Sequence, residues 1–224
     1  MSNLLFADSH FDDNKSKLNS CCCKIFCNGC NYANKKREWE QGLEYKCPYC
    51  REPVPDTEEE IDENLMRRIK ANDPIALNEM GVKRHNEGDY EKAFEYYTTA
   101  AGLGDADANY NLSIMYSEGQ GVERDLKKKI YHLEEAAIGG HPDARFNIGN
   151  HEFRNGRKNR AVKHWIIAAK LGEDDALHNV KLGFTCGFVS KEDYDAALRG
   201  HQAAVDATKS EQRDAAEEFF KDRN

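Results

Sequence analysis

The sequence predicts a mainly α-helical protein, in which an α-solenoid of helix pairs follows a small cysteine-rich module. Seven of the eight cysteines lie between residues 21 and 50. The stretch 76–224 contains a single proline, Pro142, as expected for helices joined by short turns. This stretch also repeats an alanine-centred pattern four times, at spacings of 32, 36 and 32 residues. Helix pairs of this length bury their apolar faces only when copies stack, so the repeats predict a solenoid.

Composition excludes several classes of partner. The 224 residues carry a net charge of -8 and have a pI of about 5.5, which argues against a nucleic acid as the main ligand. No stretch approaches the roughly 18 apolar residues of a membrane span. The first residues lack the apolar run of an export signal, so we expect an intracellular protein, cytoplasmic or nuclear. In a reducing compartment, a cysteine cluster indicates a metal site rather than disulfides.

The cysteine-rich module is expected at residues 19–54, after a flexible N-terminal tail at 1–18. Two Cys-x-x-Cys knuckles, Cys27–Cys30 and Cys47–Cys50, lie sixteen residues apart. Zinc takes four thiolate or imidazole ligands, and each knuckle supplies two of them, so the pattern predicts bound zinc. One arrangement joins both knuckles around one ion. The full set of candidate ligands is Cys21, Cys22, Cys23, Cys27, Cys30, Cys47 and Cys50.

The spacing of these cysteines resembles the second half of a RING finger. The matching run is Cys22-x4-Cys27-x2-Cys30, followed by Cys47-Pro48-x-Cys50-Arg51. The resemblance implies a cross-brace, in which the last knuckle shares its ion with Cys22 and either Cys21 or Cys23. The first knuckle would then share a second ion with an opening Cys-x-x-Cys. That opening pair is absent here, and His10 is one of the few upstream alternatives.

A RING finger recruits a ubiquitin-conjugating enzyme and has no nucleophile of its own. The resemblance therefore implies no catalytic residue, and it makes Pro48 and Arg51 candidate contacts for that enzyme. Because half of the motif is missing, two functions stay open. One is a zinc-binding adaptor without catalysis, and the other is a RING-type ubiquitin ligase.

A connecting helix is expected within 55–72. Thr57 and Glu60 fit a capping box, and Ile61, Leu65 and Ile69 follow at a spacing of four residues.

Three repeats are expected over 73–174. The second is the most complete, with Ala108-x-x-Asn111-Leu112-Ser113 and Gly119-Gln120-Gly121-Val122. This pattern resembles Sel-one-like repeats, which are relatives of tetratricopeptide repeats. The whole chain is similar to algal proteins that join a RING finger to such repeats. The resemblance implies a scaffold that holds a protein partner in its concave face. Residues 175–224 are expected to form a degenerate fourth repeat and a C-terminal capping helix.

One asparagine recurs three residues after the aligned alanine in the last three copies. These residues are Asn111, Asn147 and Asn179. They are candidates for binding the backbone of a partner peptide. The alternative is that each bonds within the repeats and fixes helix geometry, as buried asparagines usually do.

Overall fold

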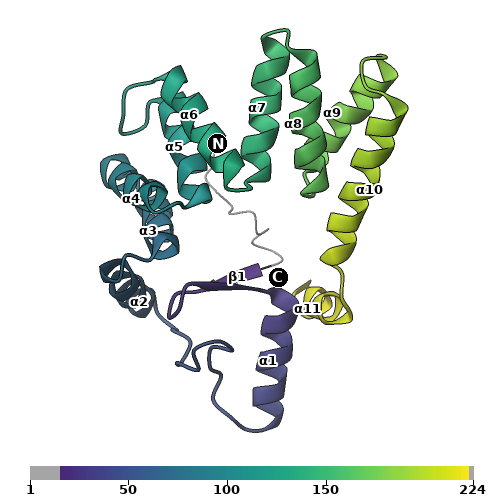
Figure 1. Ribbon diagram of the computed structural model, residues 1–224. Coiled ribbons are helices and arrows are strands. Elements are labelled where there is room, and N and C mark those ends of the chain that lie inside the picture. Colours follow the sequence, from purple (N-terminus) through teal and green to yellow (C-terminus); the bar gives the residue numbers. More distant parts are fainter. Residues whose placement is uncertain (1–15, 222–224) are drawn as a thin grey trace. The chain divides into compact units, whose positions relative to one another are not determined.

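The computed structural model describes residues 16–221, which divide into two compact units (Figure 1). The first unit holds residues 16–103 and 209–221, and the second is Gly104–Thr208. The first unit contains β1 (Ser16–Asn19), β2 (Lys24–Cys27), α1 (Asn28–Glu40), α2 (Glu58–Lys70), α3 (Pro74–Asn86), α4 (Tyr90–Gly102) and α11 (Glu211–Lys221). The second contains α5 (Ala106–Glu118), α6 (Leu126–Ile138), α7 (Pro142–Arg154), α8 (Lys158–Lys170), α9 (Asp174–Thr185) and α10 (Lys191–Ala207).

The first unit opens with an antiparallel hairpin of β1 and β2, in which Leu18 pairs with Ile25. Strand β1 thus begins inside the segment expected to be a flexible tail. The turn between the strands holds the first three cysteines, and Cys23 adopts a left-handed backbone with φ of 51°. Helix α1 follows β2 directly, with Cys27 as its N-cap.

The hairpin turn and the first repeat share one hydrophobic core. Cys23 is 1% exposed and packs with Leu65 of α2 and Met80 of α3. Ile69 and Ile75 cover the same cluster. The cysteine-rich module is therefore joined to the repeats by buried contacts as well as by the chain.

The first bond of the predicted capping box at the start of α2 is confirmed, and the return bond goes to Asp56, one residue before the N-cap. The hydroxyl of the N-cap Thr57 accepts from the backbone N–H of Glu60 at 3.2 Å. The Glu60 carboxylate in turn accepts from the backbone N–H of Asp56 at 2.9 Å. Three glutamates in the first turn favour the positive end of the helix dipole.

The C-terminal helix α11 packs against α1 in the first unit. The sequence predicts a capping helix for the solenoid in this region, whereas the observed neighbour of α11 is the cysteine-rich module. The approach is close because Gly29 has no side chain. A Cβ added there would lie 2.7 Å from the backbone nitrogen of Arg213, so a larger residue would displace α11.

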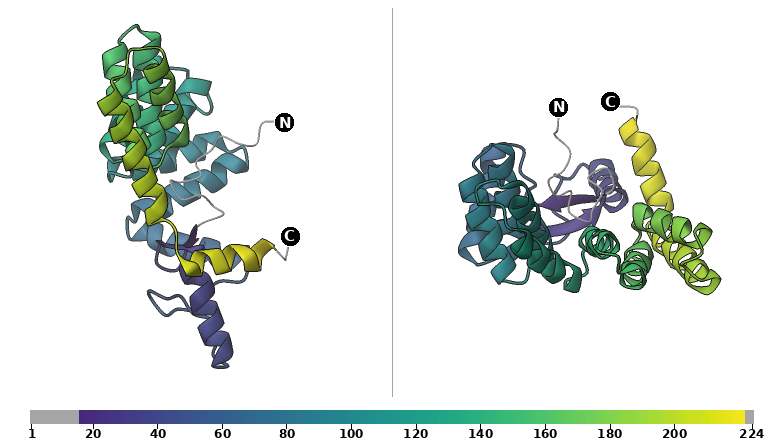
Figure 2. Two further views of the ribbon diagram at one scale, coloured as in Figure 1. Left: turned by 90° about the vertical axis from the view of Figure 1, so that its right-hand side faces the viewer. Right: turned by 90° about the horizontal axis from the view of Figure 1, so that it is seen from above.

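The second unit is a stack of antiparallel helix pairs, which Figure 2 shows from two sides. Helices α5–α6 and α7–α8 lie where the second and third repeats were predicted, and α9 and α10 form a further pair that packs on α8. Glycines on the first helix of a pair make room for aromatic rings on the second. A Cβ on Gly149 would come within 2.6 Å of the Trp165 ring, and one on Gly81 would meet Tyr97 of the first unit equally closely.

One half-buried carboxylate in the second unit faces a buried histidine. His141 is the N-cap of α7, and its Nδ1 accepts from the backbone N–H of Ala144 at 3.3 Å. That bond leaves the ring proton on Nε2, which lies 3.7 Å from Oδ1 of Asp107. Burial, followed by the negative charges of Asp105 and Asp143, raises the pKa of Asp107 to about 6.

A pH-dependent stability effect is expected at Asp107. Its neutral form is favoured by folding, so its stabilising contribution is present below pH 4 and is lost as pH rises through 6. Asp107→Asn should therefore stabilise the second unit by about 1 kcal/mol at pH 8 and leave it almost unchanged near pH 4. Thermal unfolding at both pH values checks this, with Asp175→Asn, at the exposed equivalent position, as control. A gain of equal size at both pH values would contradict the assignment.

In the described part of the chain, no helix is both long enough and apolar enough to span a bilayer.

Candidate functional site

Four cysteines converge beside the β1–β2 hairpin. The sulfur atoms of Cys21, Cys22, Cys47 and Cys50 all lie within 4.8 Å of one another. Two of these separations are 3.4 Å, between Cys21 and Cys50, and 3.7 Å, between Cys22 and Cys47. Zinc–sulfur bonds of about 2.3 Å in a tetrahedron place the sulfurs about 3.8 Å apart, so the group has the dimensions of a four-thiolate zinc site.

Backbone and side-chain amide contacts hold the two segments that carry this group, which are the hairpin turn with Cys21 and Cys22 and the loop with Cys47 and Cys50. Asn19, at the end of β1, accepts the backbone N–H of Cys23 on its carbonyl at 2.8 Å and donates its side-chain amide to Cys47 Sγ at 3.1 Å. On the other side, the backbone N–H of Arg51 closes a turn onto the Cys47 carbonyl at 3.0 Å. Arg51 has a φ of 63°, which lets the chain reverse directly after Cys50.

A buried glutamate anchors the loop that carries Cys47 and Cys50. The Glu38 side chain, on α1, is 1% exposed and accepts from the backbone N–H of Lys46 at 2.9 Å. Its other oxygen lies 2.9 Å from the Arg51 guanidinium. Burial opposes ionisation, but these two donors hold the pKa of Glu38 below its ordinary value. Sequence reasoning missed this residue, because one glutamate among several in a charged helix carries no signal of burial.

The electrostatics of the four thiols are unequal. Burial raises the pKa of Cys22 to about 11. Burial also acts on Cys47, but hydrogen bonds from the backbone of Cys50 and Tyr49 and from Asn19 lower its pKa to about 7. Four thiolates this close together repel one another, and a divalent cation offsets that repulsion. The donor set therefore fits a soft divalent metal.

The other candidate ligands lie elsewhere. Cys23 faces the core shared with α2 and α3, and Cys27 and Cys30 occupy the first turn of α1. Among the described residues, none of these three belongs to the four-cysteine group. The structure therefore does not bring the two knuckles around one ion, and it does place the last knuckle beside Cys21 and Cys22. His10 lies outside the described residues.

The candidate contacts for a conjugating enzyme occupy the same loop. Pro48 is partly buried between the two cysteines of the last knuckle. Arg51 directs its guanidinium to Glu38, although about half of its side chain remains exposed. Trp39, at the end of α1, is 82% exposed and contributes nothing to a core around the cysteines.

Two of the three repeat asparagines hydrogen-bond within the second unit. Asn111 is fully buried. Asn147 donates to the Tyr110 hydroxyl at 3.4 Å, and Asn179 donates to Oδ1 of Asn150 at 3.2 Å. These contacts favour a structural role. Partner binding by these residues stays a prediction.

Asn150, which the sequence reasoning missed, joins two repeats through one oxygen. Its Oδ1 accepts from Trp165 Nε1 at 3.1 Å as well as from Asn179. Asn150→Ala leaves both donors without this acceptor, so we expect a loss of about 1–3 kcal/mol in the free energy of unfolding. Urea unfolding measures it, and the exposed Asn159→Ala is the control. Equal effects of the two substitutions would refute this role for Asn150.

Comparison with known proteins identifies the repeats. The Sel1 repeat model matches residues 74–105, 106–141 and 142–173. The chain therefore contains three Sel1 repeats, which agree in place with the predicted copies. The match begins at residue 74, so the RING resemblance of residues 19–54 rests on those residues alone.

A curated relative shares part of the chain. DAP3-binding cell death enhancer 1 from Rattus norvegicus is 33% identical over 72 residues, which is 32% of this chain and 14% of the rat protein. The chain therefore matches only a small part of that relative.

Two solved structures share the fold. The Sel1 repeat protein from Oxalobacter formigenes superposes with a TM-score of 0.57 at 22% identity, covering 80% of this chain and 73% of the other. The protective antigen c5321 from uropathogenic Escherichia coli, described as displaying an SLR fold, gives a TM-score of 0.52 at 17% identity, covering 76% and 37%. At these identities the likeness concerns the fold alone, that of a Sel1 helical-repeat protein.

Proposed function

We propose that the protein is a zinc-stabilised adaptor whose Sel1 repeats bind a protein partner. One observation carries the zinc part of this proposal: four cysteine sulfurs lie within 4.8 Å of one another, at spacings that suit a tetrahedral ion. The group shares a hydrophobic core with the first repeat through the neighbouring Cys23. Holding the ion thus also holds the start of the repeats.

The ion would have a structural role. Cys21, Cys22, Cys47 and Cys50 would supply all four ligands of a closed site, and closed sites contribute folding free energy. Asn19 would donate to the Cys47 thiolate and so restrain its orientation, as outer residues do around structural metals. Glu38 would fix the loop that delivers the last knuckle.

A polypeptide partner for the repeats is supported by their architecture. Stacked helix pairs present extended surfaces, and solenoids use such surfaces for binding. The rat relative, which is 33% identical to this chain over 72 residues, is itself named as a DAP3-binding protein.

The two parts of the proposal are tested separately. Metal analysis of the purified chain should give one zinc per chain, and Cys50→Ser should lower that content sharply. Zinc-free, folded protein would overturn the metal part. For the repeats, a protein captured with the purified chain as bait must then bind that chain in calorimetry with a defined stoichiometry. A chain that binds no polypeptide in that assay would overturn the adaptor.

A RING-type ubiquitin ligase is the second candidate, because the last knuckle lies beside Cys21 and Cys22, as the RING resemblance implies, and Pro48 lies between the two cysteines of that knuckle. The ion pair of Arg51 with Glu38 weighs against it, since that guanidinium is already engaged. An autoubiquitination assay with a panel of conjugating enzymes separates the candidates. Activity that Cys50→Ser abolishes favours the ligase, and silence of the zinc-loaded chain favours the adaptor.

A further inference from the structure

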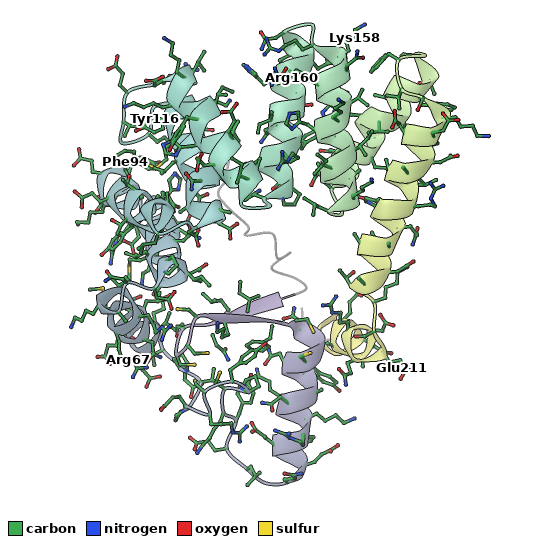
Figure 3. All side chains as sticks on the ribbon, in the orientation of Figure 1. Arg67, Phe94, Tyr116, Lys158, Arg160 and Glu211 are labelled. Atoms are coloured by element: carbon green, nitrogen blue, oxygen red, sulfur yellow. The ribbon has the colours of Figure 1, made fainter. Side chains whose placement is uncertain are left out.

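The turn between α7 and α8 carries the most positively charged stretch of the second unit. Residues 153–163 contain five cationic side chains and no carboxylate, although the whole chain has a net charge of -8. Figure 3 labels Lys158 and Arg160 at this end of the two helices. All five cations are exposed, and we call them the basic edge: Arg154, Arg157, Lys158, Arg160 and Lys163.

A buried carboxylate orders two of these guanidinium groups. Glu152, whose side chain is 7% exposed, accepts from both Nε and Nη2 of Arg157, and its Oε2 lies 3.3 Å from Nε of Arg160. The hydrogen bond from Arg157 lowers the pKa of Glu152, so this acid is ionised at neutral pH. One negative charge therefore restrains two positive charges. Because these side chains are already ordered, a partner that binds them has less conformational entropy to remove.

An aromatic pair adjoins the basic edge. Phe153, at the end of α7, is 39% exposed, and its ring centroid lies 6.0 Å from that of Phe188. Lys158 Nζ lies 5.3 Å from the Phe188 centroid, within the range of a cation–π contact. Phe153 also packs on Trp165 at 5.3 Å between centroids, so the core fixes its position. The surface thus offers an apolar contact directly beside a cation.

The preceding repeat brings further cations to the same end of the stack. Because α5–α6 and α7–α8 are successive antiparallel pairs, their two turns lie at one end. Ser117 accepts from Lys129 Nζ on its hydroxyl and from Arg124 Nε on its carbonyl, both at 2.9 Å. Burial, followed by the positive charges of Arg154 and Arg124, lowers the pKa of Lys129, and Glu118 opposes this effect. The cations of the two repeats therefore repel one another, and an anionic partner would relieve that repulsion.

The opposite end of the stack is acidic. Helices α5, α7 and α9 begin there, and their first turns carry Asp107, Asp143, Asp174 and Asp175. This separation of charge directs an anionic segment to the basic edge and repels it from the other end. A long polyanion such as a nucleic acid would extend past the basic edge onto surfaces that carry the negative charge of the chain. A short acidic peptide fits within the edge.

We propose that the basic edge binds a short acidic segment of a polypeptide, with one apolar side chain of that segment against Phe153. Arg154, Lys158 and Lys163 would pair with its carboxylates, while Glu152 keeps the two remaining arginines in place. This inference rests on the proposed function, because it names the class of polypeptide that the repeats bind and the end of the helix pairs that binds it.

The experiment measures fluorescence anisotropy with the full, zinc-loaded chain and a labelled peptide of glutamates around one central leucine. Binding should weaken as salt is added, since salt screens exposed charges. The double variant Arg154→Glu, Lys158→Glu should weaken it about tenfold. Lys181→Glu with Arg199→Glu is the matched control, because it makes the same change of charge at exposed positions outside the basic edge and should leave binding almost unchanged.

The apolar contact is measured through the peptide. Replacing its leucine by serine should weaken binding about fivefold, through loss of apolar contact with Phe153. An unchanged affinity would remove Phe153 from the proposed site. Circular dichroism of both double variants checks that the helices are intact, and the salt dependence of the wild type needs no variant.

Several other results would overturn the inference. One is equal weakening by the two double variants, and another is wild-type binding that does not depend on salt. Tighter binding of single-stranded DNA or of phosphatidylserine vesicles than of the peptide would assign the edge to another class of partner. Self-association that Arg154→Glu, Lys158→Glu abolishes would make the acidic end of a second copy the occupant. A captured protein that binds this double variant with full affinity would refute the basic edge and leave the adaptor standing, so the two proposals fail separately.

Discussion

Replacing Cys47 by serine is expected to abolish zinc binding and to unfold the cysteine-rich module. Cys47 is fully buried, and its sulfur is common to contacts with Cys22 and Asn19, so no rearrangement of the loop replaces it. Structural zinc contributes on the order of 10 kcal/mol to the folding of small modules. Metal analysis and amide hydrogen exchange should show loss of zinc and of protection in β2 and α1.

The loss of hydrogen-exchange protection should extend from the cysteine-rich module into neighbouring helices of the first unit. Cys23 packs on Leu65 and Met80, so α2 and α3 should also lose protection, while α7 and α8 of the second unit should keep theirs. Cys186→Ser is the control, because that cysteine is exposed and lies in the other unit. Wild-type protein treated with a chelator should reproduce the Cys47→Ser pattern. Unchanged protection of α1 after complete removal of zinc would contradict the structural role of the metal.

Trp165→Ala should destabilise the second unit by about 3–5 kcal/mol, the usual range for deleting a large buried aromatic side chain. Trp165 is 3% exposed and sits in the core cluster that joins α8, α9 and α10. Its ring fills the space above Gly149, and its Nε1 donates to Asn150. The substitution therefore creates a cavity and removes a buried hydrogen bond together. Urea unfolding followed by circular dichroism measures the loss.

The chain supplies a matched control for this substitution. Its other tryptophan, Trp39, is 82% exposed, so Trp39→Ala should change the free energy of unfolding by less than about 0.5 kcal/mol. Both variants lose the same side chain, so the difference between them reports the buried packing of Trp165 together with its hydrogen bond to Asn150. Similar losses for the two would mean that Trp165 is not packed as described.

The repeats were predictable because their signal is local and recurs. Alanines at 76, 108, 144 and 176 mark close helix packing, and all four side chains are fully buried. The Sel1 match and the helix pairs agree with that prediction. A repeated pattern specifies its own packing partner, since each copy stacks on the next.

The cysteine-rich module was predictable only in part. Spacing identified the knuckles, but which sulfurs share a group depends on how the hairpin turn folds, and spacing leaves that open. Glu38 and the α1–α11 contact gave no signal in the sequence. A carboxylate that will be buried looks like any other charged residue, and a helix that will dock looks like any other amphipathic segment. The glycine at position 29 was the one trace of that contact, and it reads equally as an ordinary knuckle residue.

The return of α11 to the first unit gives the chain a nested order. The backbone leaves that unit after Leu103 and re-enters it at Lys209, so the second unit is an insertion within the first. While the insertion is folded, its two ends are held at one separation, and α11 reaches α1 at a high effective concentration. Unfolding the insertion would replace that tether with a long flexible loop and add its closure entropy to the cost of docking. The docking of α11 on α1 is thereby thermodynamically linked to the folding of the repeats that lie between these two helices along the backbone.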